Sequence, residues 1–147
     1  IDIIRKQKNS HKIIVSSFDK RVCATIAQEH PDIKIALLWD KGLRLPGSFL
    51  LGPYRFLKKN NIRIFHPDIK LVTKELVSRV KNNGWQVIPY VSLSSETDPE
   101  TLWSYLMALD VDGLCTNYPR KMKLWLKEAN EDQLRFKQLH PLGTQGN

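Results

Sequence analysis

The sequence contains only two cysteines, Cys23 and Cys115, among 147 residues. They lie far apart, and neither a CxxC pair nor a paired-histidine motif accompanies them, so we expect no zinc site. Each lies among apolar residues, which predicts two buried free thiols in a cytoplasmic protein. Apolar runs are short as well. None approaches the roughly 18 residues that cross a bilayer, and the start lacks the apolar core of a signal peptide.

Proline and glycine are near average usage, and no segment combines low hydrophobicity with blocks of charge. Wholesale disorder is therefore excluded. With 41% hydrophobic and 26% charged residues, the chain has the composition of a globular domain with a real core. The first residue is Ile rather than Met, so we expect the natural N-terminus to lie upstream.

Basic residues outnumber acidic ones, with 23 Lys and Arg against 15 Asp and Glu and a net charge of +8. This balance is found in proteins that bind nucleic acid or anionic surfaces. The basic runs at 5–8, 58–59 and 120–123 are short, however, and acids lie between them. We therefore favour solvated helix faces, and keep a basic binding module for nucleic acid or an anionic lipid surface as the alternative.

Short apolar segments alternate with segments of helical periodicity along the whole chain. We expect strands at 13–15, 33–39, 62–65, 85–91 and 111–116, and helices at 19–28, 54–59, 74–83, 98–109 and from 119 onward. Residues 42–53 form the longest irregular stretch. Units of this kind predict right-handed βαβ crossovers and a parallel sheet across residues 1–138, followed by a mobile tail at 139–147.

Two α/β architectures fit this pattern, a small open parallel sheet and part of a closed (β/α)8 barrel of the TIM type. A full barrel takes about 250 residues, so this chain is long enough for only the larger half of one. Periodicity alone does not choose between the two. In both, functional groups lie at the carboxyl ends of the strands.

The residues at these strand ends are poor in acid and base groups. They are Ser16, Ser17, Phe18, Asp19, Trp39, Asp40, His66, Asp68, Tyr90, Ser92, Thr116 and Asn117. Ser17, His66 and Asp19 are the right types for a nucleophilic triad, yet no nucleophile-elbow spacing supports one. No P-loop or GxGxxG pattern is present either.

For a metal the strand ends offer mainly Asp19, Asp40, His66 and Asp68. Asp19 is better explained as a helix cap, and His66, before Pro67, as a loop residue hydrogen-bonded to backbone. We therefore assign no metal ligand within the chain. The three other histidines stand beside helix or chain ends and are expected at the surface: His11, His30 and His140.

The strand ends resemble those of a known family, the glycerophosphodiester phosphodiesterases, over about residues 12–128. The matching segments are Ile13–Asp19, for an apolar strand ending Ser-Ser-Phe; Pro31-Asp32; His66-Pro67 with Leu71–Thr73 and Asn83-Gly84; Val87–Leu93, for a Trp-Thr-Val-Asn strand; and Val111–Pro119, for Gly-Val-Asp-Gly-Ile-Ile-Thr-Asp-Tyr-Pro. The segment Val111–Pro119 is the most specific of these matches. Asp110 stands where the family's motif has its first Gly. Order and spacing both agree.

The resemblance implies a (β/α)8 barrel that hydrolyses glycerophosphodiesters to glycerol 3-phosphate and an alcohol with a divalent cation such as Mg²⁺ or Ca²⁺. The family's catalytic and metal-binding motifs are His-Arg-Gly, Glu-x-Asp, His-Asp and Glu-x-Lys. The sequence lacks the first and the last two, and its one Glu-x-Asp spacing, at 96–98, only opens the helix expected at 98–109. We therefore expect the C-terminal half of such an enzyme, inactive alone, with the cation ligands outside the chain. It should pair with the missing N-terminal half or with a second copy.

Three positions depart from the family's pattern. Tyr90 stands where Trp is usual, which keeps an aromatic wall, whereas Leu93 replaces Asn and Asn117 replaces Asp. The resemblance makes Phe18 and Tyr90 the expected substrate contacts and assigns no catalytic residue. The alternative is that Ser16, Asn117 and Tyr118 only close strand ends and cap helices.

Overall fold

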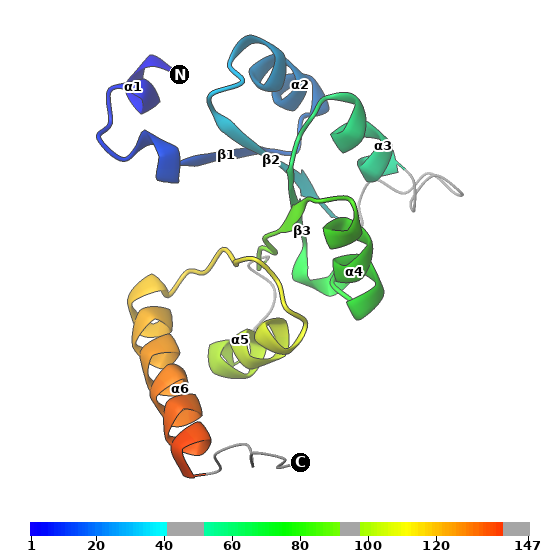
Figure 1. Ribbon diagram of the computed structural model, residues 1–147. Helices are drawn as coiled ribbons and strands as arrows, with labels where there is room; N and C mark the ends of the chain where they lie inside the picture. Colours follow the sequence, from blue (N-terminus) through cyan, green and yellow to red (C-terminus); the bar gives the residue numbers. More distant parts are fainter. Residues whose placement is uncertain (41–51, 92–97, 140–147) are drawn as a thin grey trace, which may run out of the picture.

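A computed structural model of the chain describes residues 1–40, 52–91 and 98–139. At its centre are four parallel strands in sequence order (Figure 1). They are β1 (Ile14–Ser17), β2 (Lys34–Trp39), β3 (Ile64–Pro67) and β4 (Gln86–Val87). Isolated bridges continue this ladder, from Asp68 to Tyr90 and from Tyr90 to Cys115.

The strand order decides between the two expected architectures. A doubly wound open sheet reverses its order at a switch point, whereas neighbours in a (β/α)8 barrel follow one another in sequence. Here β1 pairs with β2, β2 with β3 and β3 with β4, all parallel. The described chain therefore has the topology of part of a barrel.

The helices lie between and after the strands. They are α1 (Asp2–Arg5), α2 (Lys20–Glu29), α3 (Gly52–Lys59), α4 (Lys74–Asn82), α5 (Pro99–Ala108) and α6 (Pro119–Leu139), with 3₁₀ turns η1 (Ser10–Lys12) and η2 (Ile69–Leu71). Figure 1 shows α2, α3 and α4 following one another around the strands, with α5 and α6 beyond β3. None of these described helices is both long and apolar enough to span a membrane.

The predicted helix starts are confirmed by their caps. The side chains of Asp19, Thr73 and Asp98 each accept a hydrogen bond from a backbone N–H in the first turn of α2, α4 and α5, respectively. After α4, Gly84 has φ +71°, the left-handed conformation expected of a helix C-terminus. These four local signals set the chain direction into and out of the helices.

The core fills the space between the outer face of the strands and the helices. Leu37, Leu57 and Val80 are completely buried there, and Phe65 nearly so. Each such side chain contributes roughly 1.5–3 kcal/mol on burial. Because side chains alternate along a strand, the residues beside Leu37 and Phe65 in the chain lie on the opposite, inner face. This inner face carries His66.

The strand bounds differ from the prediction. β1 runs on through Ser17 instead of ending at residue 15, β2 begins at Lys34, and the last three strands differ more. β3 begins two residues later than expected, because Ile62 still closes the turn after α3 by donating its N–H to the Leu57 carbonyl, 2.9 Å away. β4 is shorter than 85–91, since Pro89 has no N–H to give to the ladder. The expected strand at 111–116 is reduced to the Cys115 bridge.

The N-terminal segment forms a short helix that the sequence did not predict. Arg5, at the end of α1, donates two hydrogen bonds, of 3.0 and 2.8 Å, to the carboxylate of Asp32. This bidentate pair ties α1 to the turn before β2. The predicted irregular stretch at 42–53 is outside the described residues up to 51, and Gly52 and Pro53 belong to α3. The predicted tail is also outside them, except Leu139.

Candidate functional site at the carboxyl ends of the strands

Two aromatic side chains from opposite edges of the sheet meet at its carboxyl end. The rings of Phe18, directly after β1, and Tyr90, beyond β4, lie 5.8 Å apart between centroids at an angle of 87°. In a flat sheet the two strands would be three spacings of about 4.8 Å apart, or about 14 Å. A contact across three strand spacings fits the curl of a barrel sheet, and it brings the two expected substrate contacts side by side.

His66 lies next to this pair. The expectation of a loop histidine bonded to backbone is wrong, because His66 belongs to β3 and is only 9% exposed. Its ring meets that of Tyr90 at 5.5 Å and 84°. Neither ring nitrogen has a hydrogen-bond partner among the described residues. A buried polar group left in this state costs about 1–3 kcal/mol.

Burial also sets the protonation state of this histidine. Desolvation lowers the pKa of His66 from 6.5 to about 4, because the charged imidazolium loses its hydration. At neutral pH the ring is therefore uncharged, with one nitrogen a donor and the other an acceptor. At this pH His66 is therefore not a charged imidazolium that could act as a general acid.

Carboxylates and a phenol complete the rim of the site, which we call the mouth and define by Phe18, Asp40, His66, Asp68 and Tyr90. Burial first, and then the charges of Asp68 and Asp40, raise the pKa of Tyr90 to about 12. The phenol therefore stays protonated and can donate a hydrogen bond. The carboxylate of Asp68 is buried and accepts the N–H of Lys70 at 2.8 Å, which starts η2.

The triad that the residue types allowed is not assembled. The hydroxyl of Ser17 accepts the Asp19 N–H at 3.0 Å, and the Asp19 carboxylate caps α2 and pairs with Arg21 at 3.3 Å. His66 bonds to neither of them. Ser17 and Asp19 therefore shape the turn from β1 into α2 instead of carrying chemistry.

The last predicted strand end also has a turn-closing role. The hydroxyl of Thr116 accepts the N–H of Tyr118 at 3.0 Å, just before α6 begins. Asn117 and Tyr118 are exposed there. Cys115 is exposed too, so the prediction of two buried thiols is correct only for Cys23. Ser92 and Leu93 lie outside the described residues.

The side chains that the structure describes do not group three or more His, Cys, Asp or Glu where an ion would bind. Ca²⁺ takes six to eight oxygen ligands, and Mg²⁺ takes six, of which one or two come from carboxylates and the rest from waters and substrate oxygens. Asp40 and Asp68 at the mouth therefore do not make such a site by themselves.

A lysine that the sequence reasoning passed over lies beside β2. The Lys20 ammonium, in the first turn of α2, is 4.8 Å from the centroid of the Trp39 ring and 5.8 Å from that of Phe56. This is cation–π geometry on the helix-covered face. Trp39, one of the predicted strand-end candidates, is buried and belongs to the core rather than to the mouth.

Both the sequence and the fold of the chain match known proteins of one family. The model of the glycerophosphoryl diester phosphodiesterase family matches residues 1–121. A search of curated proteins finds no significant match. Among solved structures, one from Galdieria sulphuraria assigned as a glycerophosphodiester phosphodiesterase has a TM-score of 0.70 at 22% identity, and covers 85% of this chain and 48% of its own.

Two further structures agree. A phosphodiesterase from Oleispira antarctica, in complex with the product sn-glycerol-3-phosphate, has a TM-score of 0.60 at 18% identity and covers 78% of this chain and 41% of its own. A glycerophosphodiester phosphodiesterase from Parabacteroides distasonis has a TM-score of 0.61 at 17% identity. The match covers 87% of this chain and 49% of that structure's chain. The chain thus spans about half the length of these structures, and the prediction of a partial TIM-type barrel is confirmed. By the match over residues 1–121, the chain belongs to the glycerophosphoryl diester phosphodiesterase family.

Proposed function

We propose that this chain supplies the C-terminal part of a barrel that hydrolyses glycerophosphodiesters to glycerol 3-phosphate and an alcohol. The observation that carries the proposal is the family match over residues 1–121, on a fold that covers about half of the related structures. The bound product of the Oleispira antarctica enzyme, sn-glycerol-3-phosphate, supports the choice of substrate class. We place this activity in the cytoplasm.

The mouth supports a binding role for this part of the barrel. Phe18 is 49% exposed and stands against Tyr90, so the pair offers an apolar wall to the carbon skeleton of a glycerol group. The protonated phenol of Tyr90 adds a donor. His66 is neutral and has no acid or base partner among the described residues, so we assign general acid–base catalysis to groups beyond them.

A divalent cation, Mg²⁺ or Ca²⁺, belongs to the proposal as a group held outside this chain. The described acids at the mouth do not form a ligand set for it. Once bound by the rest of the barrel, a cation would polarise the phosphoryl group. It would also offset the charges of Asp40 and Asp68, which otherwise oppose a phosphate at the mouth.

The open side of the sheet supports the need for a completing partner. β1 is at the edge of the sheet, and Ile14 and Ser16 on it are exposed. Edge strands offer unpaired backbone groups to another chain. We propose that the missing N-terminal half of the barrel, or a second copy of this chain, covers this edge.

The experiment compares two proteins. One is the pure 147-residue chain, and the other is the product of the natural reading frame extended upstream of Ile1. We expect release of glycerol 3-phosphate from glycerophosphocholine by the extended protein only, with a cation present. Steady release by the pure chain would refute its proposed inactivity. An inactive extended protein containing the family's His-Arg-Gly and Glu-x-Asp motifs would contradict the proposed activity.

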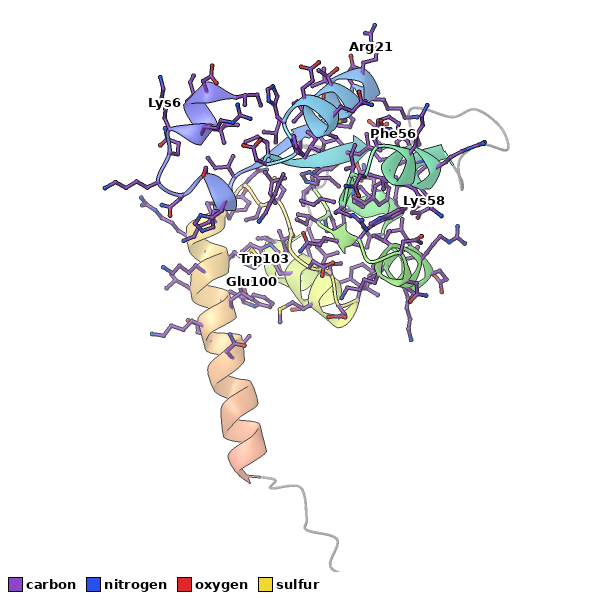
Figure 2. The ribbon with its side chains drawn as sticks, turned by 45° about the horizontal axis from the view of Figure 1, so that its top comes forward. Lys6, Arg21, Phe56, Lys58, Glu100 and Trp103 are labelled. Atoms are coloured by element: carbon purple, nitrogen blue, oxygen red, sulfur yellow. The ribbon has the colours of Figure 1, made fainter. Side chains whose placement is uncertain are left out.

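The alternative of a nucleic-acid module finds little support in the charge distribution. Figure 2 shows Lys6 just after α1, Arg21 on α2 and Lys58 on α3 at separate places on the molecule. Nucleic-acid binding would show a steep salt dependence. Duplex DNA and anionic vesicles titrated at low salt should therefore show no saturable binding.

A further inference from the structure

His66 differs from the other buried polar residues at the described positions. The amide of Asn60 donates to the Phe56 carbonyl at 2.9 Å, and the carboxylate of Asp68 accepts from Lys70 at 2.8 Å. His66 is buried as deeply, and both of its ring nitrogens are without a partner. Buried polar groups without a hydrogen bond are rare in folded proteins, so the histidine at this position needs a physical reason.

Packing alone does not explain a histidine at this position. Ile64 lies on the same face of β3, one pleat earlier, and fills its place without a polar atom. Leu38, directly opposite His66 in the register of β2 and β3, does the same. An aliphatic side chain at 66 would avoid the desolvation of two ring nitrogens. The imidazole is therefore suited to a partner that enters from outside the described chain.

The chemistry of the ring narrows the class of partner. A neutral imidazole offers one donor and one acceptor, and an alcohol hydroxyl can satisfy either of them. A phosphate oxygen only accepts, and at this position it meets the negative charges that surround Tyr90, those of Asp68 and Asp40. The surroundings therefore favour a hydroxyl over a phosphate beside His66.

Access to the imidazole depends on the two aromatic rings of the mouth. Tyr90 stands edge to face against His66, and Phe18 stands edge to face against Tyr90. Phe18 is half exposed, so it has room to turn toward solvent and release Tyr90. Rotation of Tyr90 about its χ1 bond would then uncover a ring nitrogen.

We propose that His66 is a ligand-binding residue of the mouth, which holds a hydroxyl group of a polyol through a ring nitrogen when Tyr90 turns aside. This inference rests on the proposed function, because it assigns the glycerol part of the ligand to His66 and leaves the phosphate to other groups. His66 thereby sets specificity for a hydroxyl-bearing ligand and takes no part in bond cleavage.

The test follows the histidine ring nitrogens of the complete 147-residue chain by ¹⁵N NMR. Glycerol, sn-glycerol 3-phosphate and inorganic phosphate are the three probes. Glycerol and sn-glycerol 3-phosphate should shift the His66 nitrogens saturably, and phosphate alone should not. His66→Gln keeps a donor and an acceptor and should retain most of the affinity. His66→Phe keeps an aromatic ring without polar atoms, and its affinity should fall about tenfold or more. Circular dichroism checks that both variants fold.

Three results would overturn the proposal. Saturable changes at the rings of Phe18 and Tyr90, followed in aromatic ¹H–¹³C spectra of the same samples, with none at His66, would remove the role of His66 and leave the proposed function intact. A response of His66 to inorganic phosphate alone would identify an anion contact in place of a hydroxyl contact. The absence of any response at the mouth would count against both this proposal and the aromatic wall.

Discussion

The ring of Phe18, at the end of β1, meets the ring of Tyr90, beyond β4, edge to face at a centroid separation of 5.8 Å. Two further strands, β2 and β3, lie between them in the sheet. The contact therefore closes the carboxyl end of a curled sheet, and it joins a structural feature of the barrel to the surface where we expect the ligand.

The first prediction concerns Phe18. Because Phe18 is about half exposed, Phe18→Ala should cost only about 1 kcal/mol of unfolding free energy, the scale of one aromatic pair. It removes half of the apolar wall, so the affinity for sn-glycerol 3-phosphate should fall about tenfold. Urea denaturation and an NMR titration measure the two effects.

The matched control for this change is Phe56→Ala. Phe56 is a half-buried phenylalanine on α3, labelled in Figure 2, and its ring faces Lys20 instead of the mouth. The control should lose stability to a similar or greater extent and keep its affinity. Equal affinities for Phe18→Ala and the unmodified chain would show that Phe18 is not a ligand contact.

The second prediction concerns pH. The pKa of His66 is lowered to about 4 in the folded chain from 6.5, so the unfolded chain takes up its proton first as the pH falls. The stability associated with neutral His66 is complete above pH 6.5 and is lost progressively down to pH 4. The loss should be no more than about 3.5 kcal/mol, since one pKa unit corresponds to about 1.4 kcal/mol.

His66→Phe should flatten this part of the profile, because no group at position 66 then takes up a proton. Urea unfolding at pH 7.5, 5.5 and 4.5 measures the slope in both proteins. His11→Gln, at an exposed position in η1, serves as the control and should keep the original slope. If His66→Phe and the unmodified chain lose stability in parallel, the acid sensitivity comes from other groups.

Local signals in the sequence predict the helix starts and the general order of the elements. Asp19, Thr73 and Asp98 each act on backbone groups within three residues, so their roles are readable without knowledge of the fold. The same holds for Gly84 and its positive φ. Choosing between an open sheet and a barrel depends instead on which strands pair, and periodicity does not contain that information.

His66 shows why the site was harder to predict. Its neighbour Pro67 indicated a loop, yet proline is tolerated at the last position of β3, where Pro67 still provides its carbonyl to the Tyr90 N–H. The burial of His66 comes from residues distant in sequence, such as Tyr90. Cys115 is the opposite case, an apolar-flanked residue left exposed because its segment forms only one bridge.

The third prediction concerns Asp110, which stands where the family has Gly. Asp110 has φ +60°, in the left-handed region that favours glycine, and its carboxylate pairs with Lys81. Asp110→Gly should change stability by less than about 0.5 kcal/mol, because relief of backbone strain offsets the lost ion pair. Asp110→Ala loses the pair and keeps the strain, so it should cost about 1 kcal/mol.

Gly84→Ala provides the comparison for the strain alone. Gly84 has φ +71° and no atom within 4 Å of an added Cβ, so its replacement carries only the backbone cost, about 1 kcal/mol. Urea denaturation of the three variants at neutral pH measures these differences. Asp110→Ala with the full stability of the unmodified chain would mean that neither the ion pair nor the conformation matters there.

The last prediction concerns how α6 is held. Both views show this helix of 21 residues projecting beyond the rest of the described chain (Figures 1 and 2). Its Trp125 lies 5.5 Å from the buried Trp103 of α5, and Lys121 pairs with Glu100 at 2.9 Å. Trp103, labelled in Figure 2, lies on the side of α5 nearest α6.

The aromatic contact should dominate, because exposed ion pairs contribute only about 0.2–1 kcal/mol. Trp125→Ala is expected to cost about 2 kcal/mol and to speed amide exchange throughout α6, since a partly buried tryptophan loses its contacts. Lys121→Ala should cost less than about 0.5 kcal/mol. Leu124→Ala, at a position 64% exposed on the same helix, tests whether any apolar truncation has this effect. Slow exchange in Trp125→Ala would show that α6 is anchored elsewhere, and rapid exchange confined to α6 would identify Trp125 as its anchor on α5.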